Sequence, residues 1–172
     1  SNTPKYSNKT IYLAKIDYRK RQHIFQNIQG LYYAGNIADD RFDASSSRYL
    51  GEWDKPTLYS NLTDYANLAL LSDGEAHPLV CMEALSAGLG LVLSEFATAN
   101  LDLSLPFIDV IPEDKITNIQ YISKILKDNR SRSVLLRDQI KEYSNTLSWD
   151  NVASGLYIPT YNKIISKSEV KL

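Results

Sequence analysis

Short apolar runs alternate along the chain with longer segments whose apolar residues recur at helical spacing. The apolar runs predict strands at residues 10–14, 31–34, 68–71, 89–93 and 107–111, and residues 48–52 also resemble a strand. The other periodic segments predict helices at residues 19–28, 55–65, 78–87, 115–127, 132–143 and 148–165. Strands that alternate with helices are typical of a parallel sheet covered on both faces. The pattern therefore predicts a three-layer α/β domain.

The size and composition fit one such domain. The chain has 172 residues, of which 44% are hydrophobic and 23% are charged, as is ordinary for a globular protein with its own core. We expect the domain to span residues 10–172, with residues 1–9 as a disordered linker or tag remnant. The formal net charge of -1 indicates no general affinity for nucleic acid or for acidic lipids.

Cysteine usage and hydropathy bear on the compartment. Cys81 is the only cysteine, so no internal disulfide can form, and a reducing environment fits. Cys81 lies in an apolar helical segment, which favours a core residue over a nucleophile. The sequence shows no signal-peptide pattern and no apolar run near 18 residues. These features predict a cytoplasmic protein.

Two glutamates stand eight residues apart, at the start of the predicted third helix. Glu75 follows the turn signal of residues 72–74, and Pro78 suits the first position of the helix, which should stop at Gly88. Glu83 then lies about one and a half turns inside the helix. Helical side chains lean toward the N-terminus, so we expect Glu83 to reach toward the helix mouth, near Glu75.

The mouth of this helix also predicts an anion site. The backbone N–H groups of Leu79 and Val80 have no partner within the helix and suit a phosphate. Two carboxylates beside such a site suit a ligand with hydroxyls and phosphates, such as a nucleotide sugar. The alternative is that both glutamates are solvated surface residues, since this spacing also arises by chance on amphipathic helices.

Basic residues are expected at the same place. Residues 1–30 carry six Lys/Arg against one Asp, whereas residues 31–118 carry mostly acids. This asymmetry alone is compatible with ordinary surface variation. However, Lys15 and Lys20 follow the first predicted strand, and Glu75 follows the fourth. The carboxyl ends of parallel strands share one edge, where ligands of such sheets bind. This convergence favours a site.

The order of these segments resembles the C-terminal, donor-binding domain of retaining GT-B glycosyltransferases of the group 1, or family four, class. Residues 75–83 match the E-x7-E motif of that family, and residues 13–20 are similar to the basic segment after its first strand. Residues 33–36, 50–51 and 148–149 show weaker similarity. The resemblance covers roughly residues 10–165 and implies a Rossmann-like domain, one half of a GT-B fold.

The resemblance also implies roles for particular residues. Glu75 would lie against the donor sugar and Glu83 would contact the nucleotide ribose, while Lys15 and Lys20 would neutralise the diphosphate. His77 could contact the sugar or a phosphate, although a solvent-facing loop histidine is the simpler interpretation. The implied activity is that of a hexosyltransferase that uses a UDP, GDP or similar nucleotide sugar.

No metal or other cofactor is expected. His23 and His77 stand alone in the sequence, and no cluster has the spacing of metal ligands. Fixed cations and helix amides can stabilise the charge that develops on the departing diphosphate without a metal.

The sequence departs from the family pattern at several positions. Ala14, Lys15 and Arg21 replace the usual Gly, Arg and Gly, and residues 76–78 replace Gly-Phe-Gly. Lysine keeps the charge of arginine but loses its bidentate fork. Two alternatives therefore stay open. One is a binding module that has lost turnover, and the other is a related GT-B enzyme such as an epimerase or a phosphorylase, for which no pyridoxal lysine is identified.

The length limits what the domain can do alone. GT-B enzymes react substrates in a cleft between two such domains, and this chain is long enough for one. We expect the N-terminal acceptor domain to be missing from it, so that the isolated domain binds a nucleotide sugar weakly and transfers little. The missing half could place the protein at a membrane surface, near a membrane-associated acceptor. No nucleic-acid partner is expected.

Overall fold

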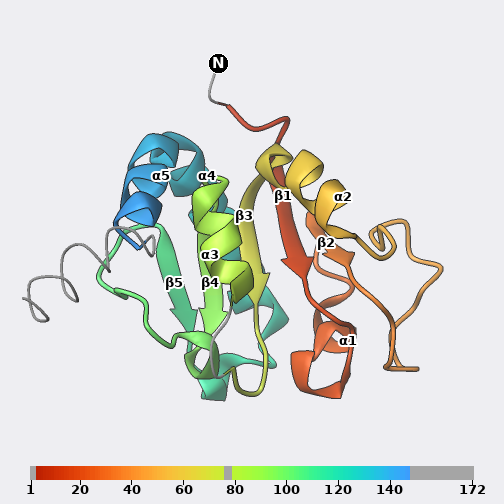
Figure 1. Cartoon of the computed structure of the whole chain (residues 1–172). Helices are drawn as coiled ribbons and strands as arrows, with labels where there is room; N and C mark the ends of the chain where they lie inside the picture. The colour runs from red at the N-terminus through yellow and green to blue at the C-terminus, as the bar shows by residue number, and fades with distance from the viewer. Residues whose placement is uncertain (1–2, 76–78, 148–172) are drawn as a thin grey trace, which may run out of the picture.

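The computed structural model describes residues 3–75 and 79–147, and its centre is a five-stranded parallel sheet (Figure 1). The strands lie in the order β2-β1-β3-β4-β5. Their bounds are β1 (Tyr6–Leu13), β2 (Leu31–Ala34), β3 (Tyr65–Leu70), β4 (Gly90–Ser94) and β5 (Ile108–Ile111). Every pair of neighbouring strands is parallel. The predicted fold class, a three-layer α/β domain of Rossmann-like type, is confirmed.

Helices cover both faces of the sheet (Figure 1). The α-helices are α1 (Gln22–Phe25), α2 (Lys55–Asn61), α3 (Leu79–Ser86), α4 (Ile119–Leu135) and α5 (Arg137–Thr146). Short 3-10 helices are η1 (Tyr18–Lys20), η2 (Leu62–Asp64), η3 (Glu95–Ala97) and η4 (Glu113–Lys115). Helix α4 packs across one face of the sheet, and α3 packs on the other face, where it also contacts α5. None of the described helices is long and apolar enough to cross a bilayer.

The central strands are buried on both faces, which explains their continuous apolar runs. All residues of β3 and β4 are buried, and Leu68 of β3 pairs in register with Leu91 of β4. Cys81 of α3 is fully buried against them, as expected of a core residue. Burial raises the pKa of its thiol to about 12.

A buried polar seam joins α4 to the sheet. The amide of Asn129 in α4 donates to the carbonyl of Leu91 at 3.1 Å and accepts from the side chain of Asn67 at 2.8 Å. Gly90 allows this close approach, because a Cβ at this position would lie 1.9 Å from the hydroxyl oxygen of Ser133.

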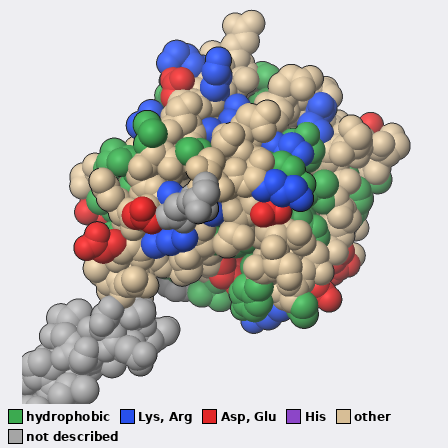
Figure 2. Space-filling view, turned by 90° about the horizontal axis from the view of Figure 1, so that it is seen from above, with side chains coloured by type: hydrophobic (Ala, Val, Ile, Leu, Met, Phe, Trp, Pro, Cys, Tyr) green, Lys and Arg blue, Asp and Glu red, His purple; other side chains and the backbone are tan. Residues whose placement is uncertain are grey.

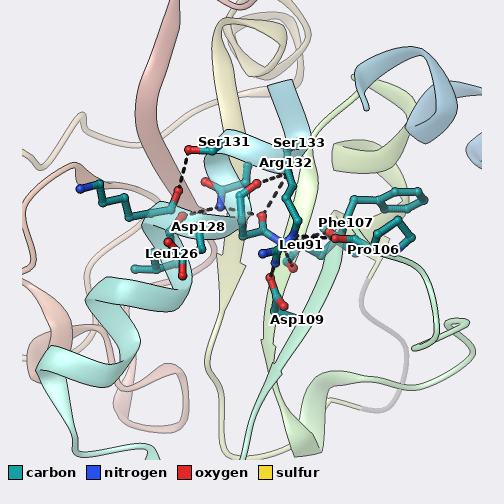
Figure 3. Close-up of polar contacts among 12 residues, drawn as sticks. Leu91, Pro106, Phe107, Asp109, Leu126, Asp128, Ser131, Arg132 and Ser133 are labelled. Carbon is teal, nitrogen blue, oxygen red and sulfur yellow. Dashed lines mark hydrogen bonds and ion pairs between the residues drawn. The ribbon is translucent and has the colours of Figure 1, made fainter. Parts of the chain in front are cut away.

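Arg132 extends the contacts between α4 and the sheet. Its guanidinium donates to the backbone carbonyl of Pro106 at 2.9 Å and pairs with the carboxylate of Asp109 in β5 (Figure 3).

Several Lys and Arg side chains lie on the face at the amino ends of the strands (Figure 2). Those near η2 have structural partners. Lys5 approaches Asp64 at 4.0 Å, and Arg137 donates to the carbonyls of Thr63 and Ala87 at 2.6 and 3.1 Å. These contacts tie the chain near β1 and the start of α5 to the segment before β3, so they stabilise the fold.

The strand predicted at residues 48–52 is wrong. The segment forms only one bridge, in which Tyr49 lies beside Tyr33 of β2. The chain leaves the sheet at Gly51, whose φ of 83° does not belong to an extended strand. Only Tyr49 and Leu50 of the segment are apolar, and it is too short to extend the ladder.

The predicted helix at residues 19–28 is also wrong as a single element. Arg21 takes a left-handed φ of 59°, which separates η1 from α1. Another difference lies at the N-terminus, where β1 begins at Tyr6, so residues 6–9 belong to the sheet and not to the expected linker.

The later helices are shifted from their predicted bounds. The segments predicted at 115–127 and 132–143 form α4 and α5, which meet at Leu136. The side chain of Asn118 caps α4 by accepting from the N–H of Tyr121 at 3.0 Å, which sets the start of the helix. The segment predicted as a helix at 55–65 forms α2 and η2, and the helix predicted at 148–165 lies outside the described residues.

The predicted stop of α3 at Gly88 is confirmed, since the helix ends at Ser86 and Gly88 closes its last turn. The φ of Gly88 is 81°, and the N–H of Gly88 donates to the carbonyl of Leu85 at 2.9 Å. The N–H of Leu89 donates to the carbonyl of Ala84, also at 2.9 Å. This pair of bonds is the Schellman motif, which satisfies the last carbonyls of a helix.

Candidate functional site

The strand order reverses between β1 and β3, and open α/β sheets have their ligand crevice at such a reversal. From β1 the chain proceeds outward to β2, whereas β3, β4 and β5 proceed in the opposite direction. Ligands of open α/β sheets bind at such a switch point, outside the carboxyl ends of the strands. Residues 14–21 follow β1 and residues 71–75 follow β3, at the lower edge of the sheet in Figure 1.

These two loops are joined by hydrogen bonds and an ion pair. The N–H of Asp73 donates to the carbonyl of Arg19 at 2.7 Å, and the Arg19 guanidinium donates to the carbonyl of Gly74 at 3.1 Å. The ammonium of Lys20 pairs with the carboxylate of Glu75. Their side chains are 20% and 17% exposed. The structure thus brings together two residues that the sequence placed at one sheet edge.

Local contacts fix the position of Lys20. Its N–H donates to the carboxylate of Asp17 at 3.1 Å, which caps η1. Its carbonyl accepts from the hydroxyl of Tyr12 at 2.6 Å, and that hydroxyl accepts from the N–H of Leu71 at 3.0 Å. The buried Tyr12 therefore links the loop after β1 to the end of β3. Sequence reasoning missed this role, because Tyr12 reads as an ordinary core residue of a strand.

The ammonium of Lys20 is partly buried from solvent. Burial lowers the pKa of Lys20 below the usual value, the nearby Arg19 acts in the same direction, and Asp17 opposes them. A buried cation needs an anionic partner. Glu75 supplies that partner in this structure.

Glu75 is tied to the loops beyond β4 and β5. Its N–H donates to the carbonyl of Phe96 in η3 at 2.9 Å. The neighbouring Glu95 accepts from the N–H of Glu113 in η4 at 3.0 Å. The loops that follow β3, β4 and β5 therefore form one connected edge.

Arg21 is a second basic residue in this edge that sequence reasoning did not place in the site. Its guanidinium donates to both carboxylate oxygens of Glu113 at 2.7 and 3.0 Å and pairs with Asp73 at 3.1 Å. The side chain is 13% exposed, and the bonds to Glu113 raise the pKa of Arg21. One signal was available, because Arg21 stands where the resembling family has glycine, and glycine often marks a positive φ.

Lys15 lies at the same edge but has a different environment. It is exposed and forms no ion pair with any described residue. Its backbone carbonyl accepts from the amide of Gln22 at 2.9 Å. Its ammonium is therefore available to an anion in solution.

Glu83 is half-buried in a groove between α3 and the α2–η2 segment. The groove is mainly apolar, with Leu58, Tyr59, Leu62 and Met82 among its lining residues. Lys20, and not Glu83, is the described partner of Glu75. The expected approach of Glu83 to Glu75 stays a prediction.

Helix α3 begins at Leu79, whose side chain is 65% exposed, while Val80 packs against the core. His77 and Pro78 lie outside the described residues. The anion site at the amides of Leu79 and Val80 therefore also stays a prediction. Within residues 3–75 and 79–147, no group of three or more His, Cys, Asp or Glu side chains could hold a metal ion.

Neither a protein-family model nor a curated protein matches this sequence. Solved structures do share its fold, and GT-B glycosyltransferases are among them. The lipopolysaccharide outer core galactosyltransferase WaaB in its apo form is 18% identical, with a TM-score of 0.67 over 90% of this chain and 49% of that one. WaaG, a glycosyltransferase involved in lipopolysaccharide biosynthesis, is 14% identical, with a TM-score of 0.60 over 86% of this chain and 45% of that one.

A third structure, HepE of Anabaena in complex with UDP-glucose, is 13% identical, with a TM-score of 0.60 over 96% of this chain and 49% of that one. This chain spans about half the length of each of these three proteins. At such low identity the likeness establishes the fold, a Rossmann-like domain of the kind found in GT-B glycosyltransferases.

Proposed function

We propose that this domain binds the nucleotide-sugar donor of a retaining GT-B glycosyltransferase. The observation that carries the proposal is the ion pair of Lys20 and Glu75, beyond the carboxyl ends of β1 and β3. The shared fold supports it, since one protein of that fold, the Anabaena HepE, was solved with UDP-glucose.

The diphosphate of the donor takes the place of Glu75 as the partner of Lys20. A half-buried ammonium already held in position binds a phosphate at little entropic cost. Lys15, exposed at the same edge, supplies a second cation. The amides of Leu79 and Val80 add hydrogen-bond donors at the start of α3.

Displacement from Lys20 gives Glu75 its role with the sugar. The released carboxylate accepts hydrogen bonds from the sugar hydroxyls beside the diphosphate. Lys20 then stabilises the charge that develops on the diphosphate as the bond to the sugar breaks. These cations belong to the chain, so we propose that binding requires no divalent metal.

Glu83 is assigned to the nucleoside part of the donor. Its carboxylate lies beside an apolar groove, and it can accept hydrogen bonds from a pair of ribose hydroxyls. His77 is retained as a candidate contact to the sugar or a phosphate.

A binding module without turnover is the second candidate. The observation that favours it is Lys15, which replaces the arginine of the resembling family and cannot hold a phosphate with a bidentate fork. Transfer from a nucleotide sugar by the complete protein, with its acceptor half, separates an enzyme from such a module.

Calorimetry with UDP, GDP and ADP, with and without chelator, tests the donor site. We expect at least one nucleotide to bind with chelator present. Lys20→Ala should weaken its binding by about tenfold or more, as expected when a charged hydrogen bond is lost. Lys124→Ala is the matched control, because Lys124 is an exposed lysine of α4 that pairs with Asp128. Equal binding by the Lys20 variant and the wild type would exclude this site.

A further inference from the structure

We propose that Arg21 is a positioning residue that clamps the loop carrying Lys20 onto the opposite side of the crevice. The inference rests on the proposed function, in which Lys20 binds the diphosphate. Arg21 would act through Lys20 and would not itself touch the ligand.

The guanidinium joins segments that follow three different strands. Arg21 follows β1, Asp73 follows β3, and Glu113 follows β5. The guanidinium forms two hydrogen bonds to Glu113 and an ion pair with Asp73. A planar fork that engages one carboxylate with two bonds fixes orientation as well as distance. The clamp therefore restrains the turn in which Lys20 lies.

The backbone of Arg21 indicates that the side chain matters at this position. In the described part of the chain, only Arg21 and Asn100 are non-glycine residues with a positive φ. A φ of 59° is unfavourable for any side chain with a Cβ and costs glycine little. Glycine would make the same turn without strain, but it would leave Asp73 and Glu113 without the guanidinium. The clamp offsets the strain of the turn.

The clamp also changes the charge that a diphosphate meets. Asp73 and Glu113 are partly exposed at 53% and 35%. Without a cationic partner, these carboxylates would repel an anion that approaches Lys20. Arg21 thus acts in two ways, since it fixes the turn of Lys20 and neutralises two acids at the rim of the crevice.

The variant Arg21→Gly separates the clamp from the turn, because glycine suits the left-handed backbone. The first readout is the rate at which acetic anhydride labels Lys20, measured by mass spectrometry on the protein without ligand. The second is the affinity for inorganic pyrophosphate, measured by calorimetry. We expect Lys20 labelling to rise severalfold, because the turn is released. Pyrophosphate affinity should fall about tenfold, because Lys20 is no longer held in position and Asp73 and Glu113 repel the anion.

Three further variants keep the result specific. Arg21→Lys retains the charge without the fork and should show the same changes to a smaller degree, which decides the matter if the glycine variant does not fold. Arg132→Ala removes an arginine that pairs with Asp109, away from the crevice, and should leave both readouts unchanged. Arg21→Gly combined with Glu113→Gln restores the local charge but not the tie, so Lys20 labelling should stay raised.

The proposal is overturned if Arg21→Gly leaves Lys20 labelling at the wild-type rate, or if the added Glu113→Gln returns labelling to that rate. A different result would separate the two proposals. If the wild type binds neither pyrophosphate nor any nucleotide, yet Arg21→Gly still raises Lys20 labelling, the clamp stands and the donor-binding function fails.

Discussion

Replacing Glu75 with glutamine should make the domain less stable and yet a better binder of nucleoside diphosphates. Glu75→Gln keeps the shape of the side chain and removes the charge that pairs with Lys20. The wild type must break this pair before a phosphate can reach Lys20. The variant has no such pair to break, and it lacks a negative charge that would repel the phosphate.

The magnitudes follow from the burial of the pair. Exposed ion pairs contribute about 0–1 kcal/mol, and removing one partner of a buried pair costs about 3–5 kcal/mol. Side chains that are 20% and 17% exposed lie between these cases, so we expect a loss of about 1–3 kcal/mol. In a domain of this size, that loss lowers Tm by roughly 3–10 °C. A bound diphosphate would give Lys20 of the variant an anionic partner again. If this restores about 1.4 kcal/mol of the lost stability, the diphosphate binds the variant about tenfold more tightly.

The assay is calorimetry of a nucleoside diphosphate and of the matching nucleotide sugar, beside thermal melts. The sugar nucleotide should gain less than the diphosphate, because Glu75→Gln also weakens the proposed contact with the sugar. Glu83→Gln is the matched control and should weaken both ligands, by about 1.5–3 kcal/mol. If Glu75→Gln weakens the diphosphate as severely as Lys20→Ala does, Glu75 does not compete for Lys20 and the reasoning is wrong.

Three other predictions concern the charge, the core and the packing of the helices. Burial lowers the pKa of Lys20, and an anion needs its protonated form, so diphosphate affinity should fall as pH rises toward 10.5 in the wild type and stay flatter in Lys20→Ala. Cys81 should react with iodoacetamide only on unfolding, because burial raises the pKa of its thiol to about 12; rapid labelling at pH 8 in native buffer would contradict its placement. Gly90→Ala should destabilise the domain by about 2 kcal/mol or more in urea unfolding, because its Cβ would meet Ser133. Ala87→Gly, at the half-buried residue that follows α3, is a control expected to cost about 1 kcal/mol at most.

The sequence predicted the architecture well because burial on both faces leaves a clear signal. The continuous apolar runs at β3 and β4 indicate either buried strands or short buried helices. Their alternation with longer helical segments along the chain favoured strands. The segment at 48–52 shows the limit of this reasoning. Tyr49 and Leu50 are apolar, as in a strand, but the segment forms a single bridge at Tyr49 and turns at Gly51, and the sequence pattern indicates neither feature.

The site was predictable where topology alone decides it. Lys20 and Glu75 follow adjacent parallel strands, so their convergence follows from strand order. The contact of Arg21 with Glu113 could not be predicted, because 92 residues separate them and the pairing depends on a left-handed turn. An arginine in the place of a family glycine was the only sign of that turn.

Mapping of a bound nucleoside diphosphate by backbone amide NMR tests the central claim most directly. The account predicts that titration with the best-binding diphosphate, in the presence of chelator, shifts the amides of residues 15–21, 73–75 and 79–80. The amides of α4, which lies on the face of the sheet away from α3, should not shift. Shifts confined to α4, or to the face at the amino ends of the strands, would contradict a donor site in the crevice between β1 and β3.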